Sequence, residues 1–210
     1  MRNEGVNKNM NNNVGSRFIA IAAVAAFLGG AACAKAPQEA IDGATASLQA
    51  ATDAEAAKYA PESFRAAEDA LNSANAEIAA QNEKFALLRS YDQASQLLTQ
   101  ASEAADKAKV EAEENREKAR VSSEAAIQAA KTAIEAAKAA VDAAPAGKGT
   151  RAEIEAMRSE LAAMETALTE ASQMFEAKDY LGAQAKAESV RSQAEAISND
   201  VGQAIAKKRT

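Results

Sequence analysis

The sequence predicts an all-α protein, an elongated antiparallel helical bundle or coiled coil in which one long helix is shared by the others. The chain of 210 residues holds 9 Gly and 3 Pro, which leaves few signals for strands and tight turns. It is rich in Ala, Glu, Lys, Gln and Leu, which have the highest helix propensities. Its apolar residues recur in alternating steps of three and four, as they do in supercoiling helices.

The first 32 residues have the parts of an export signal peptide. Residues 1–17 are polar, with three basic residues against one acidic residue, and small residues follow the apolar run at 18–28. These 11 apolar residues would extend roughly 16 Å as a helix, about half a bilayer, so we expect an export signal and not a permanent membrane span. Translation starts at Met1 or at Met10, which would give a shorter polar region.

Cys33 is the only cysteine of the chain, and it follows "GGAA" at the end of this segment. The stretch resembles a bacterial lipobox, in which a cysteine after small residues receives diacylglycerol and becomes the mature N-terminus. Lipoboxes usually carry Leu three residues before the cysteine, where this chain has Gly30. We therefore predict lipid attachment at Cys33, with residues 33–37 as a lipidated tether. The alternative is ordinary cleavage near "AACA", which would leave Cys33 as an incidental thiol.

Two helices are expected next, over residues 38–58 and 61–82. They are separated by "KYAPES", because the residue before a proline is disfavoured in the α conformation and Pro61 suits a first helical turn. The apolar row of the first helix is Ile41, Ala44, Leu48 and Ala51, and that of the second is Phe64, Ala67, Leu71, Ala74 and Ile78.

A single long helix is expected over residues 87–143, because steps of three and four continue through this stretch almost without interruption. The predicted row runs through Leu87, Tyr91, Ala94, Leu98, Ala101, Ala105, Ala108, Ala112, Asn115, Ala119, Ser122, Ala126, Ala129, Ala133, Ala136, Ala140 and Ala143. A second row beside it, Ile127, Ile134 and Val141, would allow the last part of this helix to face two partners.

The C-terminal part is predicted to be a hairpin of two helices, 151–176 and 179–206, after a break at 145–150. Asp179 is a suitable N-cap for the second of them. The motif Tyr-x-x-Ala opens a helix at Tyr91 and again at Tyr180, and we interpret both tyrosines as core residues beside loops rather than as binding groups.

These helices are expected to form two three-helix bundles, 38–115 and 116–207, which share the long helix. The polar stretch "EENREKAR" would lie at the joint between them. One long, curved hairpin is the alternative.

Residues 59–78 and 90–108, "YAPESFRAAEDALNSANAEI" and "SYDQASQLLTQASEAADKA", resemble a bacterial domain of unknown function catalogued as number 4398. The resemblance covers about residues 38–115 and rests on Tyr59-Ala60-Pro61, Ala67, Leu71, Tyr91 and Ala94. Such domains occur on alanine-rich exported lipoproteins and have no established activity. The loop "AQNEKFALLRS" is longer than the tight turn usual in that family.

A weaker likeness is to alanine-rich coiled coils of the murein-lipoprotein type. Their terminal lysine is joined to peptidoglycan, whereas this chain ends in Thr210 after the basic "AKKR". The likeness therefore implies a helical envelope lipoprotein without predicting the covalent bond.

The residue types that catalysis needs are sparse in this chain. It has no His, which excludes Ser-His-Asp and Cys-His nucleophiles and zinc sites that use His. Carboxylates such as Glu103 and Glu114 are expected to pair with Lys107 and Lys118, four residues on, as solvated helix support. There is no phosphate-binding loop or calcium loop, so we predict no enzyme, no cofactor and no metal.

The net charge and the expected localisation limit the classes of partner that this chain can have. The formal net charge is −6 and aromatic residues are few, which argues against nucleic acid as a partner. We expect a non-enzymatic structural lipoprotein of the bacterial cell envelope, held on the membrane by its lipid and facing the periplasm, with an envelope protein or peptidoglycan as its contact. By resemblance to Gram-negative lipoproteins, Ala34 after the cysteine indicates the outer membrane.

The alternative function is a periplasmic adaptor that binds another envelope protein or a hydrophobic cargo through its helical surface. The sequence indicates no apolar patch outside the heptad rows, so we expect function to depend on length more than on a particular face.

Overall fold

The computed structural model describes residues 35–144 and 150–208, without the side chains of 207 and 208. Every described helix lies within residues 33–210. The described residues form helices and no strand, so the predicted all-α class is confirmed. The helices are α1 (Gln38–Asp53), α2 (Ala56–Tyr59), α3 (Pro61–Glu83), the 3-10 turn η1 (Ala86–Leu88), α4 (Asp92–Ala143), α5 (Arg151–Glu176) and α6 (Tyr180–Lys208).

The observed bounds equal the predicted ones for α5, lie within two residues of them for α3 and α6, and differ more at two places. The predicted helix 38–58 is divided into α1 and α2, because Glu55 has a left-handed φ of 60° that interrupts the helix. The long helix begins at Asp92, while Leu87 lies in the 3-10 turn before it.

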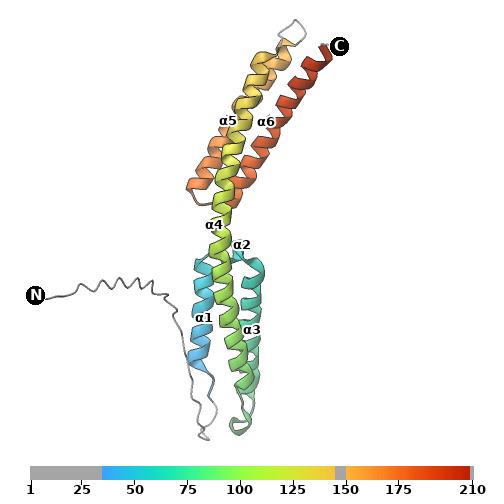
Figure 1. The fold of residues 1–210 in the computed structure, drawn as a ribbon. Coiled ribbons are helices and arrows are strands. Elements are labelled where there is room, and N and C mark those ends of the chain that lie inside the picture. The colour runs from blue at the N-terminus through green and yellow to red at the C-terminus, as the bar shows by residue number, and fades with distance from the viewer. Residues whose placement is uncertain (1–34, 145–149, 209–210) are drawn as a thin grey trace, which may run out of the picture. The chain divides into compact units, whose positions relative to one another are not determined.

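The helix α4 is shared by all the other α-helices (Figure 1). The helices α1, α2 and α3 contact its first half, and α5 and α6 contact its second half. The predicted shared long helix is therefore confirmed, and the single curved hairpin is not the arrangement that forms.

The buried face of α4 follows the predicted row only in its first half, through Ala94, Leu98, Ala101, Ala105, Ala108, Ala112 and Ala119. Beyond Ala119 the fully buried residues are Ser123, Ala130, Ile134, Ala137 and Val141, which lie one position after the predicted main row. The predicted second row is confirmed, because Ile134 and Val141 are buried and Ile127 packs against the same cluster, which α5 and α6 share. Ala126, Ala133 and Ala140 of the main row are only partly buried at its edge. The face has moved by one residue, roughly 100° around the helix axis. Burying Ile134 and Val141 removes more apolar area from water than burying alanines, which favours this register.

Three clusters of buried side chains follow one another along α4. The middle cluster combines Tyr59 and Ala60 with Tyr180 of α6, so this core includes residues from both predicted bundles. The division at 115/116 stays a prediction. All core residues and the partly buried residues packed on them lie between Ala36 and Ile205, so a chain that begins at residue 34 keeps the whole described core.

Candidate functional site

The predicted lipid attachment residue, Cys33, lies outside the described residues. The same holds for the export segment 1–32, for most of the break at 145–150 and for the last two residues of the basic tail. Lipidation, export and their boundaries therefore stay predictions. The tether's last residues, 35–37, lead directly into α1.

The two lysines expected to form charged pairs on α4 contact other residues than the predicted ones. Lys107 contacts Glu111, with 3.6 Å between Nζ and Oε1, and not Glu103. Lys118 donates a hydrogen bond of 3.3 Å to the side-chain oxygen of Asn115, and not to Glu114. These contacts are exposed, so they remain solvated helix support. In the described part of the chain, no group of three His, Cys, Asp or Glu residues is placed to hold a metal ion.

Polar contacts also gather at the joint, where the α1–α2–α3 corner and the α5–α6 turn both meet the middle of α4. At the turn, Lys178 has a left-handed φ of 64°. The amides of Lys178 and Asp179 donate to the carbonyls of Phe175 and Met174, both at 2.9 Å, which closes a Schellman motif at the end of α5.

Asp179 then caps α6, as predicted. The amide of Gly182 donates to its Oδ1 at 3.4 Å, and the carboxylate lies at the positive end of the helix dipole. Two consecutive residues thus end one helix and begin the next, which makes the hairpin tight.

Asp179 also connects the helices that pack on the first half of α4 with those that pack on its second half. Its Oδ1 accepts a hydrogen bond of 2.8 Å from Nζ of Lys58 in α2. This bond raises the pKa of Lys58 and lowers the pKa of Asp179. Both side chains are more than a third exposed, so solvent screens the pair and limits what it adds to stability.

A second layer of contacts joins the corner to α4 itself. The side-chain amide of Asn115 donates a hydrogen bond of 2.8 Å to the carbonyl oxygen of Tyr59. Arg116 lies 3.7 Å from a carboxylate oxygen of Glu55, the left-handed residue. Asn115, expected as an interruption of the heptad row, thus holds the backbone of the corner.

Aromatic rings fill the space beneath these polar contacts. Phe175 and Tyr180 meet edge to face, with 5.4 Å between ring centroids. Tyr180 and Tyr91 are both buried, which confirms them as core residues beside loops. The buried hydroxyl of Tyr59 has no hydrogen-bond partner in the described part of the chain, while Nζ of Lys58 lies 5.3 Å from the centre of its ring.

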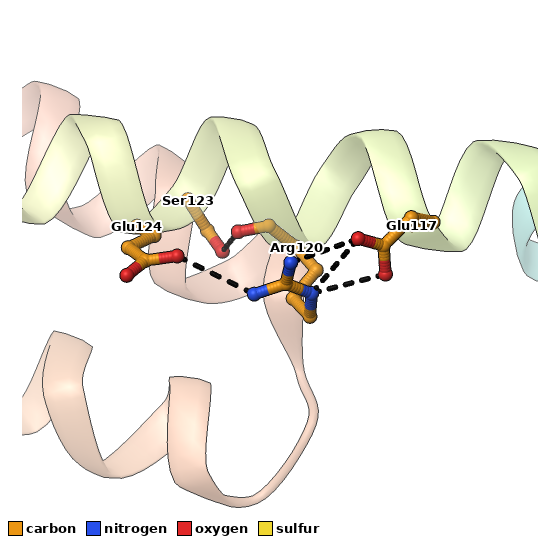
Figure 2. Close-up of polar contacts among 4 residues, drawn as sticks. All are labelled: Glu117, Arg120, Ser123 and Glu124. Carbon is orange, nitrogen blue, oxygen red and sulfur yellow. Dashed lines mark hydrogen bonds and ion pairs between the residues drawn. The ribbon is translucent and has the colours of Figure 1, made fainter.

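Figure 2 shows the polar residues of α4 just beyond the joint. The guanidinium of Arg120 donates to both carboxylate oxygens of Glu117, at 2.8 to 3.1 Å, and reaches Glu124 at 3.3 Å. The bonds lower the pKa of Glu117 and raise that of Arg120. The side chain of Ser123 is fully buried, and its hydroxyl donates a hydrogen bond of 2.8 Å to the carbonyl oxygen of Arg120. The polar contacts described at the joint therefore connect α2, α4 and the α5–α6 turn to one another.

The hollows among α4, α5 and α6 are of two kinds. An apolar cavity of about 60 Å³ lies at the far end of the hairpin, lined by residues that include Ile154, Met157 and Val201. Ligand sites usually have several hundred Å³, so this cavity is small. The larger hollows, of about 300 to 700 Å³, are grooves between neighbouring helices with charged residues along their edges.

An exposed apolar tip is the feature that sequence reasoning missed. We use "the tip" for Phe85, Leu87 and Leu88, which connect α3 to α4 and are 71%, 79% and 73% exposed. The expectation of no apolar patch outside the heptad rows is therefore wrong. The signal is present in the sequence as "FALL" within the predicted loop "AQNEKFALLRS", but the predicted long helix places Leu87 and Leu88 in its first turn.

Within residues 35–144 and 150–208, none of the helices combines the length and the apolar character needed to cross a membrane. Comparisons of the chain with protein-family models, with curated proteins and with solved structures found no match.

Proposed function

We propose that this chain is a non-enzymatic structural lipoprotein of the bacterial cell envelope, anchored by a lipid on Cys33. The observation that carries the proposal is the position of its one cysteine, directly after an apolar run and four small residues. Support also comes from the helical body, whose polar contacts at the joint hold helices to one another.

Lipidation is tested by labelling cells with radioactive palmitate. We expect the wild-type chain to take up label and to fractionate with membranes, and the Cys33→Ala variant to do neither. Mass spectrometry of the mature chain would locate its first residue. An unlabelled wild-type chain with a thiol at Cys33 that reacts with a maleimide would show ordinary cleavage instead and would contradict the anchor.

The role we propose for the helical body is that of a spacer, for which length matters more than any one face. The helix α4 has 52 residues and extends about 78 Å. Other helices pack along both halves of α4. A change of length in its second half must therefore be made at the same height in α4, α5 and α6. Ile134 and Leu168 line one groove, and Ala167 and Gln193 line the next, which places these four residues at similar heights.

The spacer role is tested with seven-residue insertions after Ala133, Ala167 and Gln193 together. They would lengthen this half by roughly 10.5 Å and preserve the heptad register of each helix. We expect this variant to fail to complement a deletion strain, while a variant with reversed charges at Glu103, Lys107, Glu114 and Lys118 complements it. The opposite pair of results would favour the adaptor.

The adaptor remains the second candidate. The apolar cavity at the end of the α5–α6 hairpin is the observation in its favour, but about 60 Å³ is too small for a hydrophobic cargo. An adaptor would therefore bind through the outer helical surface, which the charge-reversed variant tests.

A further inference from the structure

The tip differs from the other exposed apolar residues of the described structure. Val110, Val121 and Leu181 are exposed singly on helices, which is ordinary for a protein surface. Phe85, Leu87 and Leu88 fall within four consecutive residues, and each is more than two-thirds exposed. Water contact with three neighbouring large apolar side chains is costly, which points to a surface that is covered when the protein works.

The tip is held out from the bundle by hydrogen bonds at its base. The guanidinium of Arg89 donates to the carbonyls of Asn82 at 2.8 Å and Lys84 at 2.9 Å, which are left open at the end of α3. The hydroxyl of Tyr91 donates to the side-chain oxygen of Asn82 at 2.5 Å. The amide of Ser90 donates to the side chain of Gln81 at 3.1 Å. The turn between these bonds therefore presents its side chains from a fixed base.

The tip lies at the end of the bundle where the chain arrives from Cys33. Ala36, at the entry to α1, packs on the same cluster as Ile78 near the end of α3 and Tyr91 at the start of α4. Pro37 is the fourth residue after Cys33, and four steps of extended chain reach about 14 Å at most. A lipid on Cys33 would therefore bring this end of the bundle to the membrane surface.

We propose that the tip inserts Phe85, Leu87 and Leu88 into the bilayer interface next to the lipid anchor. The placement rests on the proposed function, because the anchor brings the membrane to this end. Two features suit a lipid surface: the apolar side chains come from a short turn with no flanking helix to shield them, and the exposed Lys84 beside them can meet lipid phosphates. A lipid on Cys33 would hold the chain at one point only, so a second contact would fix the distance and tilt of the bundle at the surface.

The first test uses the full chain, purified from membranes and reconstituted in phosphatidylethanolamine–phosphatidylglycerol vesicles. The protein has no Trp, so a Leu87→Trp variant reports on the tip alone, and Val121→Trp is the matched control on α4. We expect the emission of Leu87→Trp to shift to the blue and to be quenched by lipids spin-labelled on their acyl chains. The control should show neither effect. Water-like, unquenched emission from Leu87→Trp would overturn the proposal.

The second test removes the anchor and asks what the tip does alone. A chain of residues 34–210, which keeps the whole described core, is titrated with the same vesicles. Each side chain that leaves water should contribute about tenfold to partitioning, so Phe85→Ser/Leu87→Ser/Leu88→Ser should reduce it by about 1,000-fold. The triple variant Val110→Ser/Val121→Ser/Leu181→Ser removes as many exposed apolar residues elsewhere and should leave it unchanged.

Equal partitioning of the two triple variants, or none by the parent chain, would overturn the proposal. So would a blue-shifted emission of Leu87→Trp that appears without vesicles and grows with protein concentration, because a second copy would then cover the tip. The residue 34–210 chain lacks Cys33, so its result stands apart from palmitate labelling. Failure of the anchor and failure of the tip are therefore distinguishable.

Discussion

Gly182 is in contact with the residue that holds the joint together. A Cβ added to it would lie 2.2 Å from Oδ2 and 2.9 Å from Cγ of Asp179, so the carboxylate would have to move. That carboxylate caps α6 and pairs with Lys58. A glycine in the first turn of a helix, which intrinsic propensity disfavours, is here required by a side chain three residues earlier.

Gly43 provides the matched comparison, because a Cβ there would meet nothing within 4 Å. We expect Gly43→Ala to raise the free energy of unfolding by about 0.5–1 kcal/mol, the usual gain in a helix interior. Gly182→Ala should show no gain or a loss, because displacement of Asp179 offsets the same propensity. Urea unfolding followed by circular dichroism measures both. An equal gain at the two sites would show that the cap and the ion pair contribute nothing.

At the scale of elements, the register of α4 is where sequence and structure differ most. Alanine occupies so many consecutive positions after residue 124 that the sequence contains two overlapping rows, and periodicity alone does not choose between them. The neighbouring helices determine which row is buried, because α5 and α6 pack on the row that contains Ile134 and Val141. The predicted register holds where larger residues such as Leu98 mark one row only.

Adjacent alanines test this register. Ala137 is fully buried, whereas Ala136, which the predicted row contains, is exposed. We expect Ala137→Leu to lower the free energy of unfolding by about 1–3 kcal/mol, because extra methylenes overfill a packed core. Ala136→Leu should change it by less than about 0.5 kcal/mol, as is usual on a surface. Chemical denaturation measures the free energy of unfolding of both variants. A larger loss for Ala136→Leu than for Ala137→Leu would support the predicted register instead.

At the scale of the whole described unit, the joint couples the partners of the two halves of α4. The Lys58–Asp179 pair contributes only while both groups are charged. Because the pKa of Asp179 is lowered, its contribution is present above the ordinary value near 3.8 and is lost as pH falls through the folded-state pKa. Because the pKa of Lys58 is raised, its contribution is present below 10.5 and is lost as pH rises through the folded-state pKa.

Asp179→Asn tests this coupling, because asparagine keeps a helix cap and loses the charge. We expect the variant to be less stable than the wild type by about 0.2–1 kcal/mol at pH 7, the range of exposed ion pairs. The difference should shrink as pH falls below 4, and it should be smaller in a Lys58→Ala background, where only the interaction of Asp179 with the end of α6 remains. Urea unfolding at pH 7 and pH 3 measures it. A difference that is constant with pH would mean that the pair does not form.

The sequence by itself determined the helical class, the five long helices with most of their bounds, the hairpin cap at Asp179 and the burial of Tyr91 and Tyr180. These features depend on local propensity, capping and a heptad pattern marked by large residues, all of which act within a few turns of chain. Only the tertiary structure decided the register of the last half of α4, the fastening of Lys58 to Asp179 and the exposure of the tip. Each depends on what lies opposite: a helix that selects Ile134, a carboxylate from a segment 121 residues away, and, at the end of the bundle, no other described helix to cover Phe85.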